Sequence, residues 1–159
     1  IAAALINGNL TIGMGLAHGW KAIGPYLKVT KCRGPWLRTI DDQPVAEAYT
    51  RLMGYTPRDW SFPPLNELVR LYPLGLETET KGNFMVRSPI RMETDGSLRM
   101  QTSVLEGSTA RFLIGSSEGC QQAAEEAARQ ALANLGSARP VLALAFVDVA
   151  WQMLMETQP

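Results

Sequence analysis

The sequence predicts a mixed α/β domain of the α+β type, in which two main helices pack against a largely antiparallel or mixed sheet. Two observations indicate this class. Short segments of alternating apolar and polar residues follow one another with turn signals between them, which is typical of strands. Two longer segments, near residues 44–54 and 116–136, repeat apolar residues at helical spacing instead. At 159 residues, the chain has the size of one domain with its own core.

The first expected element is a strand over residues 9–20, after the turn signal Asn7-Gly8. Successive side chains of a strand point to opposite faces, so one face here is bulky and the other is nearly bare. The bulky face carries six residues: Leu10, Ile12, Met14, Leu16, His18 and Trp20. The bare face includes Gly13 and Gly15. Because glycine weakens a strand interior, its repetition predicts that another backbone or a ligand approaches this face closely.

Two strands and a helix are expected next. Residues 28–33 and 36–41 are predicted to pair about a Gly-Pro turn, and the helix begins near Pro44 and ends at Gly54. Its apolar stripe consists of Val45, Ala48, Tyr49 and Leu52. Residues 55–83 are predicted to be irregular, with one short helix ended by a proline and an exposed polar stretch after it.

A β-hairpin is expected about Asp95-Gly96, with residues 84–93 as its first arm. The apolar residues of the two arms meet on one face only if Met92 pairs with Leu98. This register predicts a three-residue loop in which Gly96 takes the left-handed conformation.

The C-terminal part predicts a strand, a long helix and a final strand. A strand at residues 111–114 precedes the helix, which Ser116 or Ser117 caps and Gly136 ends. The buried stripe of this helix is expected to be Cys120, Ala123, Ala124, Ala127, Ala131, Leu132 and Leu135. The apolar run at residues 140–151 predicts a buried central strand.

The composition argues against several kinds of partner. Lys+Arg and Asp+Glu are equal at 15 each and are not clustered, which argues against nucleic acid and anionic membrane surfaces. The apolar run at residues 1–17 is interrupted by polar residues and glycine, so neither a signal peptide nor a membrane span is expected. One histidine and two distant cysteines predict no metal site and no disulfide framework. We expect a cytoplasmic protein with reduced thiols, and a chain that is part of a larger protein.

His18 is the only histidine and the first candidate functional residue. Its strand face predicts a core residue with both ring nitrogens bonded. It could instead line a ligand pocket or act as an axial haem ligand. A hydrolase would have to use His18, with a hydroxyl or carboxylate within about 3 Å of the ring. Arg87 and Arg91 are expected on a solvated face, with an anion clamp as the alternative.

The order of the motifs resembles the FIST domain family. "HGW" at residues 18–20, "VTK" at 29–31 and "IDDQPVAEAY" at 40–49 resemble the junction between the two halves of FIST domains. "YPLGLE", "MVRSPIRMETDGSLRM" and "VLEGSTARFL" resemble later family blocks in the same order. The sequence departs from the family at Asp42, where a glycine is expected, and in the final strand, where "FVDVAW" replaces a Phe-x-Cys-x-x-Arg pattern.

This resemblance implies that residues 1–40 are the end of the N-terminal half and residues 41–159 the C-terminal half, FIST_C, truncated at its end. It implies a sensory input domain of an intracellular signal-transduction protein that binds a small ligand, amino acids among the candidates. Its expected partners are the rest of a FIST domain and a signalling output domain. The family resemblance also leaves open a haem-binding nitric-oxide sensor, and only in that case is a cofactor expected.

An enzyme is not expected, but a hydrolase that uses His18 stays open as a function, as does a plain protein-interaction module. Arg87 and Glu106 are site candidates through the resemblance, although Glu106-Gly107 also predicts a turn. Six residues form the expected ligand site: His18, Trp20, Gly13, Gly15, Arg87 and Glu106.

Overall fold

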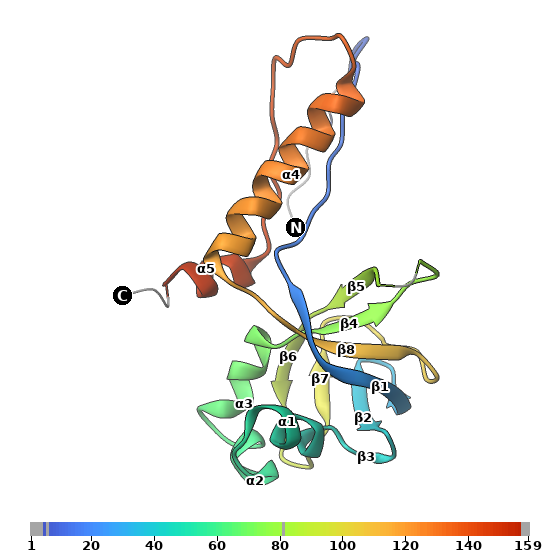
Figure 1. The fold of residues 1–159 in the computed structure, drawn as a ribbon, viewed down its shortest axis with the longest axis vertical. Coiled ribbons are helices and arrows are strands. Elements are labelled where there is room, and N and C mark those ends of the chain that lie inside the picture. Colours follow the sequence, from blue (N-terminus) through green and yellow to red (C-terminus); the bar gives the residue numbers. More distant parts are fainter. Residues whose placement is uncertain (1–4, 6, 81, 157–159) are drawn as a thin grey trace.

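A computed structural model describes residues 5, 7–80 and 82–156 (Figure 1). The strands are β1 (Lys21–Arg33), β2 (Trp36–Ile40), β3 (Gln43–Pro44), β4 (Leu74–Glu77), β5 (Phe84–Arg87), β6 (Pro89–Met92), β7 (Leu98–Met100) and β8 (Thr109–Ile114). The helices are α1 (Val45–Met53), α2 (Pro57–Trp60), α3 (Leu65–Leu68), α4 (Ser117–Leu135) and α5 (Val149–Glu156), with a 3₁₀ turn at Val69–Leu71. No helix of the described ranges combines the length and the apolar character that a membrane crossing needs.

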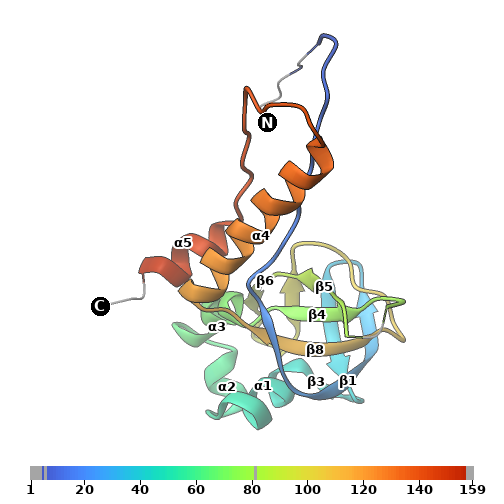
Figure 2. The same ribbon diagram turned by 45° about the horizontal axis from the view of Figure 1, so that its top comes forward.

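The strands form one strongly curved antiparallel sheet (Figure 2). Its order is β5-β4-β8-β1-β2-β7-β6, with β3 beside β2. The first half of β1 pairs with β8 and the second half pairs with β2, so this long strand joins the two parts of the sheet. The expected mixed α+β class with a largely antiparallel sheet is confirmed.

The hairpin of β6 and β7 has the register that the apolar pattern predicted. Met92 pairs with Leu98, and Glu93 N–H donates to the Ser97 carbonyl at 2.8 Å. Gly96 has φ 77°, the left-handed conformation expected of it. The alternation of apolar residues was therefore sufficient to predict the three-residue loop of this hairpin.

The prediction of one strand over residues 84–93 is wrong. The segment divides at Ser88 into β5, which pairs with β4, and β6, which pairs with β7. Pro89 follows the division, and its missing N–H removes a donor that a continuous strand would use. One stretch of sequence thus supplies both outer strands of the sheet.

The core lies between α1 and the concave side of the sheet. Tyr49 is fully buried there, and its ring centroid lies 5.2 Å from that of Trp60 and 4.7 Å from that of Phe112. The Tyr49 hydroxyl donates to the Tyr72 carbonyl at 2.9 Å. The predicted stripe of α1 is confirmed, with Leu52 half-buried at its end. The helix α2, in contrast, lies in a segment that we expected to be irregular.

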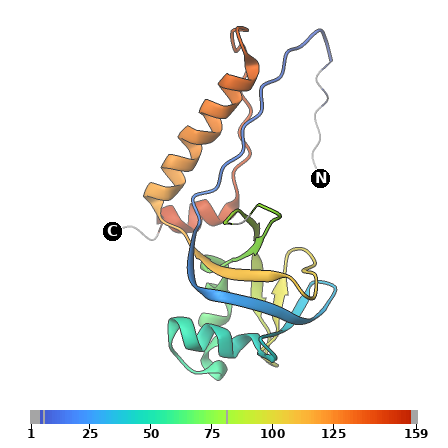
Figure 3. The same ribbon diagram turned by 45° about the vertical axis from the view of Figure 1, so that its right-hand side comes forward.

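The longest helix, α4, extends away from the sheet, and the segment 9–20 runs along it (Figures 1 and 3). Ser116 caps this helix as predicted, since the Gly119 N–H donates to its Oγ at 3.0 Å. Gly13 and Gly15 face the helix backbone: an added Cβ would lie 2.1 Å from the Ala131 oxygen and 1.8 Å from the Ala127 oxygen. The expected close approach to the glycine face is confirmed, and another backbone makes it.

Two predicted strands are not formed. Residues 9–20 are extended but unpaired, and their bulky face points to solvent instead of the core. The apolar run at residues 140–151 was expected to be a buried central strand. Residues 140–148 are instead unpaired and exposed, and residues 149–151 begin the helix α5. Both predictions assumed sheet neighbours, and the described residues place none beside these segments. Ala124 and Leu132 were expected in the buried stripe of α4. They are exposed, because no described element covers them.

Candidate functional site

The structure does not bring the six expected site residues together. His18 lies exposed on the segment before β1, and the described residues offer no hydrogen-bond partner to its ring. The expectation of a core histidine is therefore wrong, because the face that carries it is uncovered. Trp20 is half-buried against Gly115, where an added Cβ would lie 2.8 Å from the indole ring.

The remaining expected residues lie elsewhere. The backbone of α4 occupies the space that a ligand would need beside Gly13 and Gly15. Arg87 lies in β5, where one Nη donates to the Val86 carbonyl at 3.3 Å and the buried Nε has no partner among the described residues.

Glu106 lies at the far end of β1 from His18. One of its carboxylate oxygens accepts a hydrogen bond from the Cys32 N–H at 2.8 Å, and Gly107 has φ 83°. The Cys32 thiol donates to the Val104 carbonyl at 2.8 Å, and burial together with the Glu106 carboxylate raises its pKa. Glu106 therefore joins the loop before β8 to β1, a structural role consistent with the expected turn.

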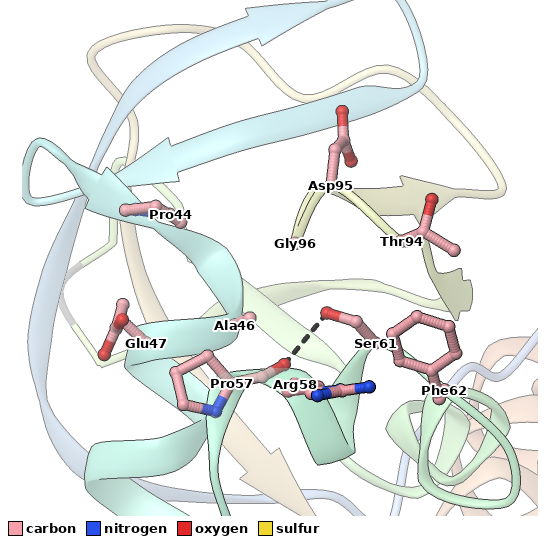
Figure 4. Close-up of a pocket in the computed structure, with 10 residues that line it drawn as sticks. All are labelled: Pro44, Ala46, Glu47, Pro57, Arg58, Ser61, Phe62, Thr94, Asp95 and Gly96. Atoms are coloured by element: carbon pink, nitrogen blue, oxygen red, sulfur yellow. Dashed lines mark hydrogen bonds between the residues drawn. The ribbon is translucent and has the colours of Figure 1, made fainter.

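A cavity of about 270 Å³ lies between α1, α2 and the β6–β7 turn (Figure 4). Its lining combines three kinds of side chain. The charged ones are Glu47, Arg58 and Asp95; the hydroxyl-bearing ones are Ser61 and Thr94; the others are Pro44, Ala46, Pro57, Phe62 and Gly96. These residues come from three separate parts of the chain, which the fold of the core brings together.

Local sequence signals build the wall formed by α2. Thr56 and Asp59 form a capping box: the Asp59 N–H donates to Thr56 Oγ1 at 3.2 Å, and the Thr56 N–H donates to the Asp59 carboxylate at 2.9 Å. Pro57 stands at the first helical position, where its missing N–H has no cost. The buried Ser61 hydroxyl donates to the Pro57 carbonyl at 2.9 Å (Figure 4), so its proton is not available to a ligand.

The turn of the β6–β7 hairpin forms the opposite wall. The Ala46 N–H, in the first turn of α1, donates to the Gly96 carbonyl at 3.2 Å and fixes the turn against the helix. The Ser97 hydroxyl and the Ser97 N–H both donate to one Asp95 oxygen, at 2.5 and 3.0 Å. These hydrogen bonds lower the pKa of Asp95, and the nearby Arg38 contributes in the same direction. Asp95 is therefore a carboxylate at neutral pH, with its second oxygen available.

Among the described residues, Arg58 is the one cation that lines this cavity, and no described carboxylate lies within ion-pair distance of its guanidinium. Its charge acts at longer range on the neighbouring Asp59, whose pKa is lowered mainly by the hydrogen bonds from Thr56. Arg58 and Phe62 also line an adjoining cavity of about 580 Å³, together with Tyr55, Asp59 and Pro63 among others. The two cavities therefore share one edge across α2. A guanidinium presents its donors as a planar fork that binds a carboxylate through two hydrogen bonds.

The lining of the cavity carries both signs of charge. Arg58 has donors for an anionic group, Glu47 and Asp95 have acceptors for a cationic one, and Phe62 adds an apolar surface. Within the described ranges, no group of three or more His, Cys, Asp or Glu side chains is placed to hold a metal ion. Sequence reasoning missed Arg58 because its segment was interpreted as irregular; the Thr56–Asp59 capping box was the signal that could have located α2.

Replacing Asp95 by asparagine tests the electrostatics of the turn. The lowered pKa means that charged Asp95 stabilises the fold above its unfolded value of about 4, and that this contribution is lost as the pH falls through the folded value. We expect Asp95→Asn to lower the free energy of unfolding at pH 7 by less than about 1 kcal/mol, because the group is exposed. Urea unfolding at pH 7 and pH 3 would show the difference shrinking in acid. Asp42→Asn is the control, and an equal loss there would contradict this role.

Two protein-family models match the chain, one in each of its two parts. The FIST C domain model matches residues 46–156, and the FIST N domain model matches residues 1–43. The chain belongs to the FIST domain family. No curated protein and no solved structure matches it.

In this FIST chain, β1 and β2 lie in the segment that the FIST N domain model matches, and β7 and β8 lie in the segment that the FIST C domain model matches. One sheet therefore contains strands of both segments. The cavity, between α1, α2 and the β6–β7 turn, is lined almost entirely by the C match.

Proposed function

We propose that this chain is a sensory input module that binds a small zwitterionic ligand, such as an amino acid, in the cavity between α1, α2 and the β6–β7 turn. The observation that carries the proposal is that Arg58, which forms no ion pair among the described residues, lines the same small cavity as the carboxylates of Glu47 and Asp95. Membership of the FIST family supports a sensory role in signal transduction. The proposal includes a cytoplasmic location and a signalling output domain as partner.

The charges on the two walls suit a molecule with both a carboxylate and an ammonium group. Arg58 would bind the carboxylate in a bidentate manner, and Asp95 and Glu47 would accept hydrogen bonds from the ammonium. Binding pockets for small molecules usually span about 300–1,000 Å³, so a cavity of 270 Å³ corresponds to the smallest ligands. The apolar side of Phe62 would contact a short side chain. A haem sensor or a hydrolase is less well supported, because neither described cavity includes His18.

Three matched probes test which charges the site requires. L-Alanine carries both charged groups, propionate lacks the ammonium, and ethylamine lacks the carboxylate. A ligand that binds only the folded state raises the melting temperature, by a free energy of about 2.7 kcal/mol at a hundred times its dissociation constant. We expect L-alanine or a larger amino acid to raise the melting temperature, and propionate and ethylamine to have a smaller effect at equal concentration.

Replacing Arg58 by glutamine is expected to weaken binding of the amino acid at least tenfold, because an amide cannot match the charged fork of the guanidinium. Isothermal titration calorimetry would measure the change. Arg33→Gln is the matched control, since Arg33 is exposed at the end of β1 and lies outside the cavity. Equal weakening in both variants, or no thermal shift with any amino acid, would refute the proposal.

A second role, in protein interaction, is favoured by one specific observation. Residues 10–16 and 141–147 expose a series of large apolar side chains that the described part of the chain does not cover. This surface is distinct from the cavity. The rest of a FIST domain, which we expected as a partner, is one candidate to cover it.

A further inference from the structure

The adjoining cavity at α2 differs in character from the charged one. It measures about 580 Å³, more than twice the volume of the first, and most of its lining residues are apolar or aromatic. These residues are Tyr55, Phe62, Pro63, Pro64 and Leu65. Tyr55 and Phe62 are 66% and 45% exposed, so a group that enters the cavity would remove apolar surface from water. The lining therefore suits an apolar group better than a second charged one.

The aromatic wall of this cavity is held in position by the core. Tyr55 has φ 62°, a left-handed conformation that is unusual for a bulky residue. Its ring packs edge-on against Trp60, with 6.2 Å between the ring centroids. Trp60 is itself buried, and its Nε1–H donates to the Gly54 carbonyl at 2.8 Å, directly before Tyr55. Backbone strain of this kind is concentrated at ligand sites, where it orients a side chain before the ligand arrives.

The polar atoms of this cavity do not favour an acidic group. Pro63 and Pro64 have no N–H to donate. Asp59 is the only carboxylate among the lining residues, and one of its oxygens accepts both the N–H and the hydroxyl of Thr56, at 2.9 and 2.7 Å. These hydrogen bonds lower the pKa of Asp59, so it is ionised at neutral pH and repels another anion.

The two cavities meet at Arg58 and Phe62, which line both of them and are labelled in Figure 4. The charged cavity, at about 270 Å³, has room for the two charged groups of an amino acid and little more. A long side chain therefore has to extend past Phe62, into the adjoining cavity. Taken together, the two cavities fall within the usual volume of a small-molecule site, about 300–1,000 Å³.

We propose that the adjoining cavity binds the side chain of the same ligand, and that this ligand is an amino acid with a long apolar or aromatic side chain. The inference rests on the proposed function, because Arg58 has to hold the carboxylate of the ligand at the shared edge. It adds the class of side chain, which the charged cavity alone does not determine. Tyr55 is then a specificity-determining residue, since it lines only the adjoining cavity.

Isothermal titration calorimetry with matched amino acids tests the class of side chain. L-Norleucine has three methylenes more than L-alanine, and each methylene that becomes buried strengthens binding about fourfold. We expect L-norleucine and L-phenylalanine to bind at least about tenfold more tightly than L-alanine. L-Lysine has the chain of L-norleucine with an ammonium at its end. We expect it to bind at least about tenfold more weakly than L-norleucine, because the ammonium loses water in an apolar cavity.

Replacing Tyr55 by alanine tests the aromatic wall. We expect Tyr55→Ala to reduce the ratio of L-norleucine affinity to L-alanine affinity at least about threefold, because the variant removes apolar surface from the adjoining cavity. Leu68→Ala is the matched control: Leu68 is 38% exposed in α3 and lines neither cavity, so this ratio should not change. Circular dichroism and thermal unfolding establish that both variants are folded.

The results distinguish this inference from the proposed function. If L-alanine binds and L-norleucine binds no more tightly, the adjoining cavity does not hold the side chain, and the proposed function stands without it. If none of the amino acids binds, the proposed function fails and this inference fails with it. Tighter binding of L-lysine than of L-norleucine, or an unchanged affinity ratio in Tyr55→Ala, would also overturn the inference.

Discussion

Replacing Tyr49 by alanine is expected to lower the free energy of unfolding by about 3–5 kcal/mol, the range for removing a fully buried aromatic side chain. Tyr49 contacts both Trp60 and Phe112, so its ring connects α1 with α2 and with the sheet. Its loss would leave a cavity at the point where these elements meet. Urea unfolding followed by tryptophan fluorescence would measure the change, because Trp60, one of the four tryptophans, contacts Tyr49.

Two further variants define how Tyr49 acts. Tyr49→Phe keeps the ring but leaves the Tyr72 carbonyl without its donor, which is expected to cost about 1–3 kcal/mol. Burial raises the pKa of Tyr49 well above its ordinary range, so the neutral phenol stabilises the fold below about pH 10 and this contribution is lost as the pH rises further. The phenylalanine variant should lack this part of the alkaline decline in stability.

The control for Tyr49 is Tyr26→Ala, in which a half-exposed tyrosine of β1 is removed. Its ring stacks under the Arg111 guanidinium at the surface, and its loss is expected to cost less than about 1 kcal/mol. If Tyr26→Ala destabilised the protein as much as Tyr49→Ala, the aromatic cluster would not be the centre of the core.

Replacing Gly15 by alanine is expected to separate the segment 9–20 from α4. The added Cβ would lie 1.8 Å from the Ala127 oxygen and 2.8 Å from the Ala127 carbonyl carbon, both backbone atoms of a helix interior that cannot move aside. Overpacking of this kind costs about 1–3 kcal/mol. Because an isolated helix of this length is marginal in water, α4 depends on that contact for its stability.

Hydrogen exchange detects this change residue by residue. We expect the amides of α4 to exchange roughly five- to 150-fold faster in Gly15→Ala, which corresponds to that loss of about 1–3 kcal/mol, while the amides of β1 and β8 keep their rates. Thr11→Ala is the control, because Thr11 is an exposed residue of the same segment. Unchanged exchange in α4 would show that the helix does not need the glycine contact.

Elements specified by local signals could be predicted from the sequence. The stripe of α1, the Ser116 cap of α4 and the Met92–Leu98 register all follow from residues close together in the chain. Gly96 in the hairpin turn and Gly136 at the end of α4 could also be predicted from such local signals. Such signals act through the backbone of a few neighbouring residues, so no knowledge of the rest of the fold is required.

Features that depend on distant partners could not be predicted. The division of residues 84–93 at Ser88 depends on β4 and β7, which pair with its two halves. An apolar run such as residues 140–148 has the composition of a buried strand whether or not a partner lies beside it. The cavity at Arg58 depends likewise on a turn more than thirty residues further along, at Asp95-Gly96. Neither the charges nor the spacing of residues along the sequence indicates that Arg58 and the turn at Asp95-Gly96 lie at the same cavity.

The central position of β1 has a consequence for the rate of folding. This strand pairs with β8, about eighty to ninety residues later in the chain, and β2 pairs with β7, about sixty residues later. Chains dominated by such distant pairings fold in milliseconds to seconds, because loop closure precedes any gain from the contact. On a ribosome, β1 and β2 must therefore remain without their long-range partners until most of the chain has emerged.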